Sequence, residues 1–376
     1  MTHGTLTYRN GRVFDGVRLL EGHGVRFEDG QFAALAPESA LPRSGPEIDL
    51  EGDILFPGFV DLQVNGGDGI LFNAAPSLDT LRRMATAHRS LGVTAFLPTL
   101  ITDTADKTEA AIATTAEAVR LGVPGIVGLH LEGPHLSVAR KGAHDGDLIR
   151  QMEEADLARL CAAAEALPLL KITVAPESVT EDQVATLADA GALISIGHTD
   201  ADYETCRRYF AAGARCVTHL FNAMSQLGNR EPGLVGAALA SGAVSAGLIA
   251  DAVHVHPQTI RAAWQAKSGP GRIFLVSDAM AVAGSDATEF ELGGRRITRR
   301  NGVLTLADGT LAGADLDLAT AVRVMVEQVG LDLAEALAAA TRVPAGMLGL
   351  RYGFTRASEA VRLAPDLSRV RPAPAG

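Results

Sequence analysis

The chemically most suggestive stretch of this chain is residues 130–135, where His130, Glu132 and His135 surround a Gly-Pro pair. The apolar run Ile126–Leu129 comes directly before it and is typical of a buried strand. A carboxylate at the end of a buried strand is costly unless a metal ion, a cation or a substrate pairs with it. We therefore interpret Glu132 as the first ligand of a metal site.

Further polar residues follow apolar runs in the same way. They are Gln63, His198, His219, His254 and Asp278. A single histidine in such a place is more often a structural residue than a ligand. Several polar groups at strand ends are a different matter, because scattered core histidines have no reason to share one face. Glu132, His198 and His219 together offer one oxygen and two nitrogens, a set that suits zinc or a similar divalent ion and leaves a position open for water.

The remaining candidates suit acid–base catalysis, polarisation of a carbonyl group and binding of an anionic group. Asp278 follows the last apolar run and is a natural general base and later a general acid. His144 lies on a loop after the Glu132 turn and either polarises a carbonyl or is a surface histidine. Arg230 with His254 suits a phosphate or a carboxylate. The alternative for Arg230 is a surface ion pair with Glu231.

The elements that would position these residues alternate along the chain from residue 54. Apolar runs are separated by helix-length amphipathic segments, as in βα units. The runs are Ile54–Val64, Thr94–Leu100, Ile126–Leu131, Leu170–Ala175, Leu193–Gly197, Cys216–Leu220, Ala246–Ala250 and Ile273–Val276. Residues 78–88 predict a helix that Gly92 closes, and Thr180 with Gln183 predicts a capping box.

This alternation predicts an α/β fold, a (βα)8 barrel in which the polar residues at strand ends converge. A doubly wound open sheet is the alternative, but no GxGxxG follows the first strand. Residues 1–56 read as short strands and turns of a small β domain. The barrel then spans 57–350, with a β-hairpin insertion near 285–312. Residues 351–376 are expected to complete the small domain as a β-sandwich.

Composition narrows the possible partners and location. The chain has 376 residues, 47% of them hydrophobic, and 33 Lys and Arg against 44 Asp and Glu give a net charge of −11. An acidic chain without a basic cluster argues against nucleic acid, although a small anionic substrate stays possible. Cys161, Cys206 and Cys216 read as reduced thiols. Without an apolar signal core or a membrane-length apolar run, we expect a cytoplasmic protein that binds no membrane.

Several motifs in this order resemble one known family. They are Pro57–Gly66, His130–His135, Gly197–Thr199, Thr218–Met224, Arg230–Gly233 and Val276–Ala279. Together they resemble the N-acetylglucosamine-6-phosphate deacetylases, metal-dependent barrels of the amidohydrolase superfamily. The resemblance covers about Gly52 to Leu350, and the combination of HLEGPH, THLFNAM and REPG is highly specific.

The resemblance implies a role for each candidate. Glu132, His198 and His219 hold one divalent ion, with zinc as first choice and Fe, Co or Mn as alternatives. Asp278 is the acid/base and His144 polarises the acetyl carbonyl. The residues implied to contact the sugar phosphate are Ala143, Asn222, Ala223, His254, Leu311, Ala312 and Gly313.

Two further implications concern the subunit and the metal count. The resemblance implies that Arg230 reaches the phosphate in a neighbouring subunit, so the active unit is a homodimer. Many amidohydrolases carry His-x-His after the first strand, where this chain has Gln63 and Asn65. We therefore expect one tight metal, with Gln63 either supporting the ligands or forming a weak second site.

The expected reaction is hydrolysis of N-acetylglucosamine 6-phosphate to glucosamine 6-phosphate and acetate. One alternative is the same chemistry on N-acetylgalactosamine 6-phosphate, another N-acyl amino sugar or a hydantoinase-like cyclic amide. Another is a non-catalytic sensor of sugar phosphates. Keeping both an acid/base and three metal ligands counts against a sensor, because binding alone requires no acid/base.

Overall fold

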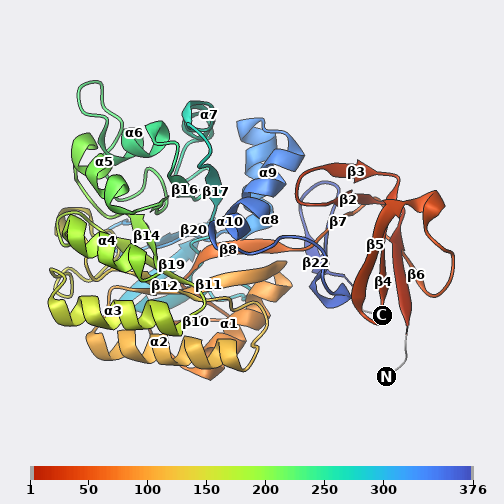
Figure 1. Ribbon diagram of the computed structural model, residues 1–376, viewed down its shortest axis with the longest axis horizontal. Helices are drawn as coiled ribbons and strands as arrows, with labels where there is room; N and C mark the ends of the chain where they lie inside the picture. The colour runs from red at the N-terminus through yellow and green to blue at the C-terminus, as the bar shows by residue number, and fades with distance from the viewer. Residues whose placement is uncertain (1–3, 374–376) are drawn as a thin grey trace.

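The structure, a computed structural model, describes residues 4–373 and consists of a barrel and a smaller β unit (Figure 1). Eight parallel strands form the barrel sheet, and each pairs with the next along the chain. They are β8 (Phe59–Val64), β11 (Val93–Ile101), β12 (Leu129–Glu132), β13 (Leu170–Val174), β14 (Leu193–Ile196), β15 (Cys216–Val217), β16 (Ser245–Leu248) and β17 (Ile273–Leu275). Every predicted apolar run overlaps one of these strands.

The first and last barrel strands approach each other just beyond their carboxyl ends. Val64 and Ala279 form a parallel bridge. The backbone N–H of Asp278 donates to Gln63 O at 3.1 Å, and that of Asn65 donates to Ala279 O at 2.8 Å. These contacts nearly close the barrel and bring the residues that follow β17 next to those that end β8. The predicted (βα)8 barrel is thereby confirmed.

Helices surround the barrel sheet (Figure 1). They are α1 (Leu78–Ser90), α2 (Ala105–Arg120), α3 (Glu154–Ala166), α4 (Glu181–Asp189), α5 (Tyr203–Ala212), α6 (Gly233–Ala240), α7 (Pro257–Ala266), α8 (Leu318–Val324), which continues as the π-helical turn Met325–Val329, α9 (Leu333–Ala339) and α10 (Arg342–Met347). The predicted capping box at α4 is formed, and Gly92 after α1 has a φ of +82°. No helix between residues 4 and 373 is long and apolar enough to span a membrane.

The insertion after β17 is a three-stranded antiparallel sheet rather than a single hairpin. Its strands are β18 (Glu289–Leu292), β19 (Arg295–Arg300) and β20 (Val303–Thr305). Leu292, Ile297 and Leu304 form its buried face, and they pack against residues of the barrel end such as Ile101 and Met280. Leu71 in the same cluster belongs to the short ribbon of β9 (Gly66–Gly67) and β10 (Ile70–Leu71). The insertion thus covers one side of the end of the barrel where the strands finish.

Both ends of the chain build the smaller β unit, which lies at the right of Figure 1. One sheet has the order β5 (Gln31–Pro37), β4 (His23–Glu28), β1 (Thr5–Arg9) and β6 (Glu47–Asp49). The other has the order β22 (Val370–Pro372), β21 (Val361–Leu363), β7 (Ile54–Phe56), β2 (Arg12–Phe14) and β3 (Leu19–Glu21). Tyr8 and Phe27 of the first sheet share a buried core with Val13 and Leu55 of the second. This is the expected sandwich, while the boundaries at residues 56 and 350 stay predictions.

Candidate metal centre and active site

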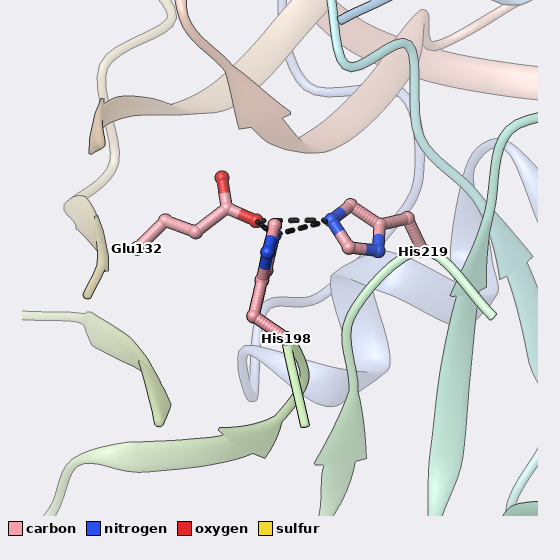
Figure 2. Close-up of side chains that lie close together, drawn as sticks. All are labelled: Glu132, His198 and His219. Atoms are coloured by element: carbon pink, nitrogen blue, oxygen red, sulfur yellow. Dashed lines mark hydrogen bonds and ion pairs between the residues drawn. The ribbon is translucent and has the colours of Figure 1, made fainter. Parts of the chain in front are cut away.

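Three buried side chains at the ends of different barrel strands form a compact cluster (Figure 2). Glu132 ends β12, His198 follows β14 and His219 follows β15. Glu132 Oε1 lies 3.2 Å from His198 Nε2 and 3.1 Å from His219 Nε2, and the two nitrogens are 3.0 Å apart. Ligand atoms of a tetrahedral ion with bonds of about 2.0 Å stand about 3.3 Å apart. The size of this triangle therefore suits one small divalent ion.

The hydrogen bond of the His198 imidazole agrees with metal ligation. His198 Nδ1 lies 2.9 Å from Arg140 O, so it carries the proton and leaves the Nε2 lone pair for a ligand bond. Burial alone would raise the pKa of Glu132, but contacts from His198 and His219 hold that pKa well below its ordinary value. A buried carboxylate facing two imidazole nitrogens is an arrangement that a cation stabilises.

The backbone turns sharply where these side chains enter the site. His198, His219 and Asp278 have φ values of +49°, +27° and +50°. Residues with side chains rarely adopt this left-handed region, and such strain persists only where the surrounding structure holds it. In this barrel the strained residues directly follow β14 and β15 or come shortly after β17, and all three side chains line the same cavity.

Asp278 lies next to the metal ligands but is held by amides. Its Oδ1 accepts hydrogen bonds from Gln63 Nε2 at 3.0 Å and from Asn65 Nδ2 at 2.7 Å. Gln63 Nε2 also lies 3.2 and 3.3 Å from the oxygens of Glu132. Burial raises the pKa of Asp278, and the nearby charge of Glu132 raises it further. A raised pKa suits a group that must take up a proton and return it.

His144 enters the site from the loop after Glu132, as the sequence predicted. Its ring centre is 4.4 Å from that of His198. The backbone N–H of Thr102 lies 3.4 Å from His144 Nδ1, and Thr102 Oγ1 lies 2.7 Å from it. Burial is the largest cause that lowers the pKa of His144 to about 3. His144 is therefore a neutral imidazole whose Nδ1 accepts from Thr102 and whose Nε2 carries the proton.

These groups line an open cavity of about 260 Å³. Of the residues implied to contact the substrate, those in its wall are Ala143, Asn222, Ala223, His254, Leu311 and Gly313. Ala312 is fully buried behind the wall and packs with the insertion. Arg230 is exposed on the loop before α6 and does not line this cavity.

His254 is held by a partner that the sequence analysis left without a role. Asp251 Oδ2 lies 2.6 Å from His254 Nδ1, and Asp251 Oδ1 accepts from the backbone N–H of His254 at 2.8 Å. Burial would raise the pKa of Asp251, but the contacts with His254 bring it below its ordinary value. The imidazole is thereby oriented, and within residues 4–373 its Nε2 makes no hydrogen bond.

Other wall residues had no sequence signal of their own. They are Ile101, Gly142, Ile249, Met280, Leu292 and Thr310. Conversely, two histidines of the opening motif are structural. His130 Nε2 lies 2.8 Å from Thr173 Oγ1, and His135 Nδ1 lies 3.1 Å from Arg150 O.

Comparison with known proteins identifies the family. The amidohydrolase family model matches residues 54–355. The N-acetylgalactosamine-6-phosphate deacetylase of Shewanella sp. (strain ANA-3) is 47% identical over 300 residues, covering 80% of this chain and 75% of that protein. The N-acetylglucosamine-6-phosphate deacetylase of Haemophilus influenzae is 34% identical, covering 88% and 87%.

Solved structures agree with this assignment. A variant of the N-acetyl-D-glucosamine-6-phosphate deacetylase from Mycobacterium smegmatis, in complex with N-acetyl-D-glucosamine 6-phosphate, superposes with a TM-score of 0.89. It is 33% identical in sequence, and the match covers 98% of this chain and 97% of that one. The chain therefore belongs to the amidohydrolase family and groups with its amino-sugar-phosphate deacetylases.

Proposed function

We propose that this protein hydrolyses the acetamide of N-acetyl-D-glucosamine 6-phosphate, releasing acetate and D-glucosamine 6-phosphate. The observation that carries the proposal is the buried Glu132–His198–His219 cluster beside Asp278 in one cavity. Relatives that bear the name of this activity support it, as does the similar structure that holds the sugar phosphate.

Glu132, His198 and His219 would hold one divalent ion. Such an ion supplies a water of lowered pKa as nucleophile and polarises the acetyl carbonyl. We propose zinc, since it favours one oxygen and two nitrogen ligands with an open position, and Fe, Co or Mn could use the same set. Gln63 offers amide hydrogens to Glu132 and Asp278, so its role is to support these carboxylates rather than to bind a second ion.

Asp278 and His144 would carry the proton transfer and the stabilisation of charge. The raised pKa of Asp278 lets its carboxylate accept a proton from the attacking water and deliver it to the leaving amine nitrogen. His144 stays neutral, and its Nε2–H would donate to the acetyl oxygen as negative charge develops there.

The rest of the cavity would bind the sugar phosphate. The residues in its wall that would contact the sugar are Ala143, Asn222, Ala223, Leu311 and Gly313. The imidazole of His254, oriented by Asp251, would meet the phosphate. Arg230 lies outside the cavity of its own subunit. We therefore propose that it reaches the phosphate in a second subunit, and that the active unit is a homodimer in the cytoplasm.

One observation favours a second candidate substrate. The relative that is 47% identical is named for N-acetylgalactosamine 6-phosphate, which differs from the glucosamine compound only in the orientation of the C4 hydroxyl. Both sugars carry the same acetamide and phosphate, so the metal centre and His254 would serve either. Comparing kcat/KM for the two epimers decides between them.

Acetate release from metal-free and zinc-restored protein tests the proposed activity. The substrates are both N-acetylhexosamine 6-phosphates and unphosphorylated N-acetylglucosamine; a cyclic amide is tested beside them by its ring-opened acid, because its hydrolysis releases no acetate. We expect release from the phosphorylated sugars that vanishes on chelation and returns with zinc. Sugar-phosphate binding without turnover in fully metallated protein would instead support a non-catalytic sensor and refute the proposal.

A further inference from the structure

Two amide side chains at the end of β8 hold one oxygen of Asp278. Residues two apart on a strand point to the same face, so Gln63 and Asn65 both approach Asp278 from β8 and its end. Their nitrogens lie 3.0 and 2.7 Å from Asp278 Oδ1. Gln63 is 1% exposed and Asn65 is 3% exposed. Bulk water therefore competes little with these hydrogen bonds.

The two amides differ in what they hold. Gln63 Nε2 divides its hydrogens between Asp278 and the oxygens of Glu132. Among residues 4–373, Asn65 makes its one side-chain hydrogen bond to Asp278, and its Oδ1 has no donor. The bond to Asp278 alone therefore orients the Asn65 amide. The backbone of Asn65 is fixed at the same place, because its N–H donates to Ala279 O.

This arrangement makes the two oxygens of Asp278 unequal. Oδ1 carries both amide hydrogen bonds, whereas no hydrogen bond reaches Oδ2 from the described part of the chain. Asp278 also has a left-handed φ of +50°, a conformation that its contacts with neighbouring segments maintain. A carboxylate gripped at one oxygen presents the other in a single orientation.

We propose that Asn65 is a positioning residue for the proton transfers of Asp278. By holding Oδ1 it leaves Oδ2 as the oxygen that exchanges protons, an inference that rests on the proposed deacetylase activity. As the water oxygen bonds to the acetyl carbon, one O–H bond of the water breaks and its proton moves to Oδ2. When the C–N bond breaks, the same proton moves from Oδ2 to the amine nitrogen, and acetic acid and the amino sugar leave.

Asn65→Leu tests this role, since leucine has the same branched shape and no donor. Asn73→Leu is the matched control, because Asn73 is another buried asparagine, bonded to Ile101 O and Asp103 rather than to Asp278. We expect Asn65→Leu to lower kcat by about 100-fold while KM and zinc content stay within about threefold of the wild type. Asn73→Leu should change kcat by less than about threefold.

The possible results separate the alternatives. If Asn65→Leu keeps the wild-type kcat, the inference is overturned. It is also overturned if Asn73→Leu shows the same loss of kcat, or if Asn65→Leu loses zinc together with kcat. If Asn65→Leu does not fold, Asn65→Ser replaces it, because the serine hydroxyl is too short to reach Asp278 Oδ1. Its kcat, KM and zinc content are then compared with those of the wild type. Failure of the wild type itself to release acetate would reject the proposed function, and this inference with it.

Discussion

Replacing Asp278 by asparagine should stop proton transfer and leave the metal centre intact. The amide oxygen of the new side chain can still accept from Gln63 and Asn65, whose nitrogens lie 3.0 and 2.7 Å from Oδ1. Its NH₂ group then stands in the place of Oδ2 and cannot accept a proton. General acid–base catalysis contributes about 10²- to 10⁴-fold, so kcat should fall by that factor, or about 3–5 kcal/mol in activation free energy.

The assay measures acetate release together with zinc content and KM. Zinc should remain, because Glu132, His198 and His219 are unchanged, and KM should change by less than about fivefold. Asp61→Asn is the matched control, since Asp61 is a buried carboxylate that accepts from the backbone N–H of Ser277 and does not line the cavity. Turnover of Asp278→Asn within about tenfold of the wild type would refute an acid/base role. Parallel loss of zinc and turnover would make Asp278 a metal ligand instead.

Three further changes test other parts of the site and fold. Arg230→Ala should raise KM for the phosphorylated sugar without changing zinc content, and an unchanged KM would remove Arg230 from the phosphate site. Glu132→Gln should weaken zinc binding by more than about 100-fold, which exceeds the loss typical of residues that only hydrogen-bond to metal ligands. Zinc titration measures this affinity, and an unchanged affinity would contradict the assignment of Glu132 as a ligand. Burial lowers the pKa of His88 from 6.5 to about 4, so the stability due to its neutral form is complete above pH 6.5 and lost as pH falls towards 4. Urea unfolding at pH 7.5 and 4 should show the wild type losing roughly 3 kcal/mol more than His88→Gln, and equal losses would contradict this.

The barrel was predictable because its signals are local. Each buried parallel strand overlaps a mainly apolar run, and several helices between the runs, such as α1 and α4, carry their own caps. The capping box of Thr180 and Gln183 involves residues three apart, so it could be recognised before any tertiary contact was known. Strand β18 (Glu289–Leu292) of the insertion was missed because it carries only two apolar residues, too few to distinguish a strand from a loop.

The partners within the site were not predictable in the same way. The sequence placed Glu132, His198, His219 and Asp278 at strand ends, and the topology of a parallel barrel then implied a shared face. It did not show that Thr102 determines the tautomer of His144, or that Asp251 orients His254. Both partners do follow apolar runs, but each acts by holding another side chain, and no local pattern shows which side chain that is.

By itself, the sequence determined the elements, the residue types at their ends and the chemistry those types allow, since periodicity and strand ends are properties of neighbouring residues. Only the tertiary structure decided which atoms meet. His198 lies 66 residues from Glu132 in the chain, and Asp278 lies 213 residues from Asn65. Whether such pairs come into contact depends on strand register and on the contact between β8 and the segment after β17. The register and this contact both depend on packing across the whole barrel, and a local sequence pattern does not contain that information.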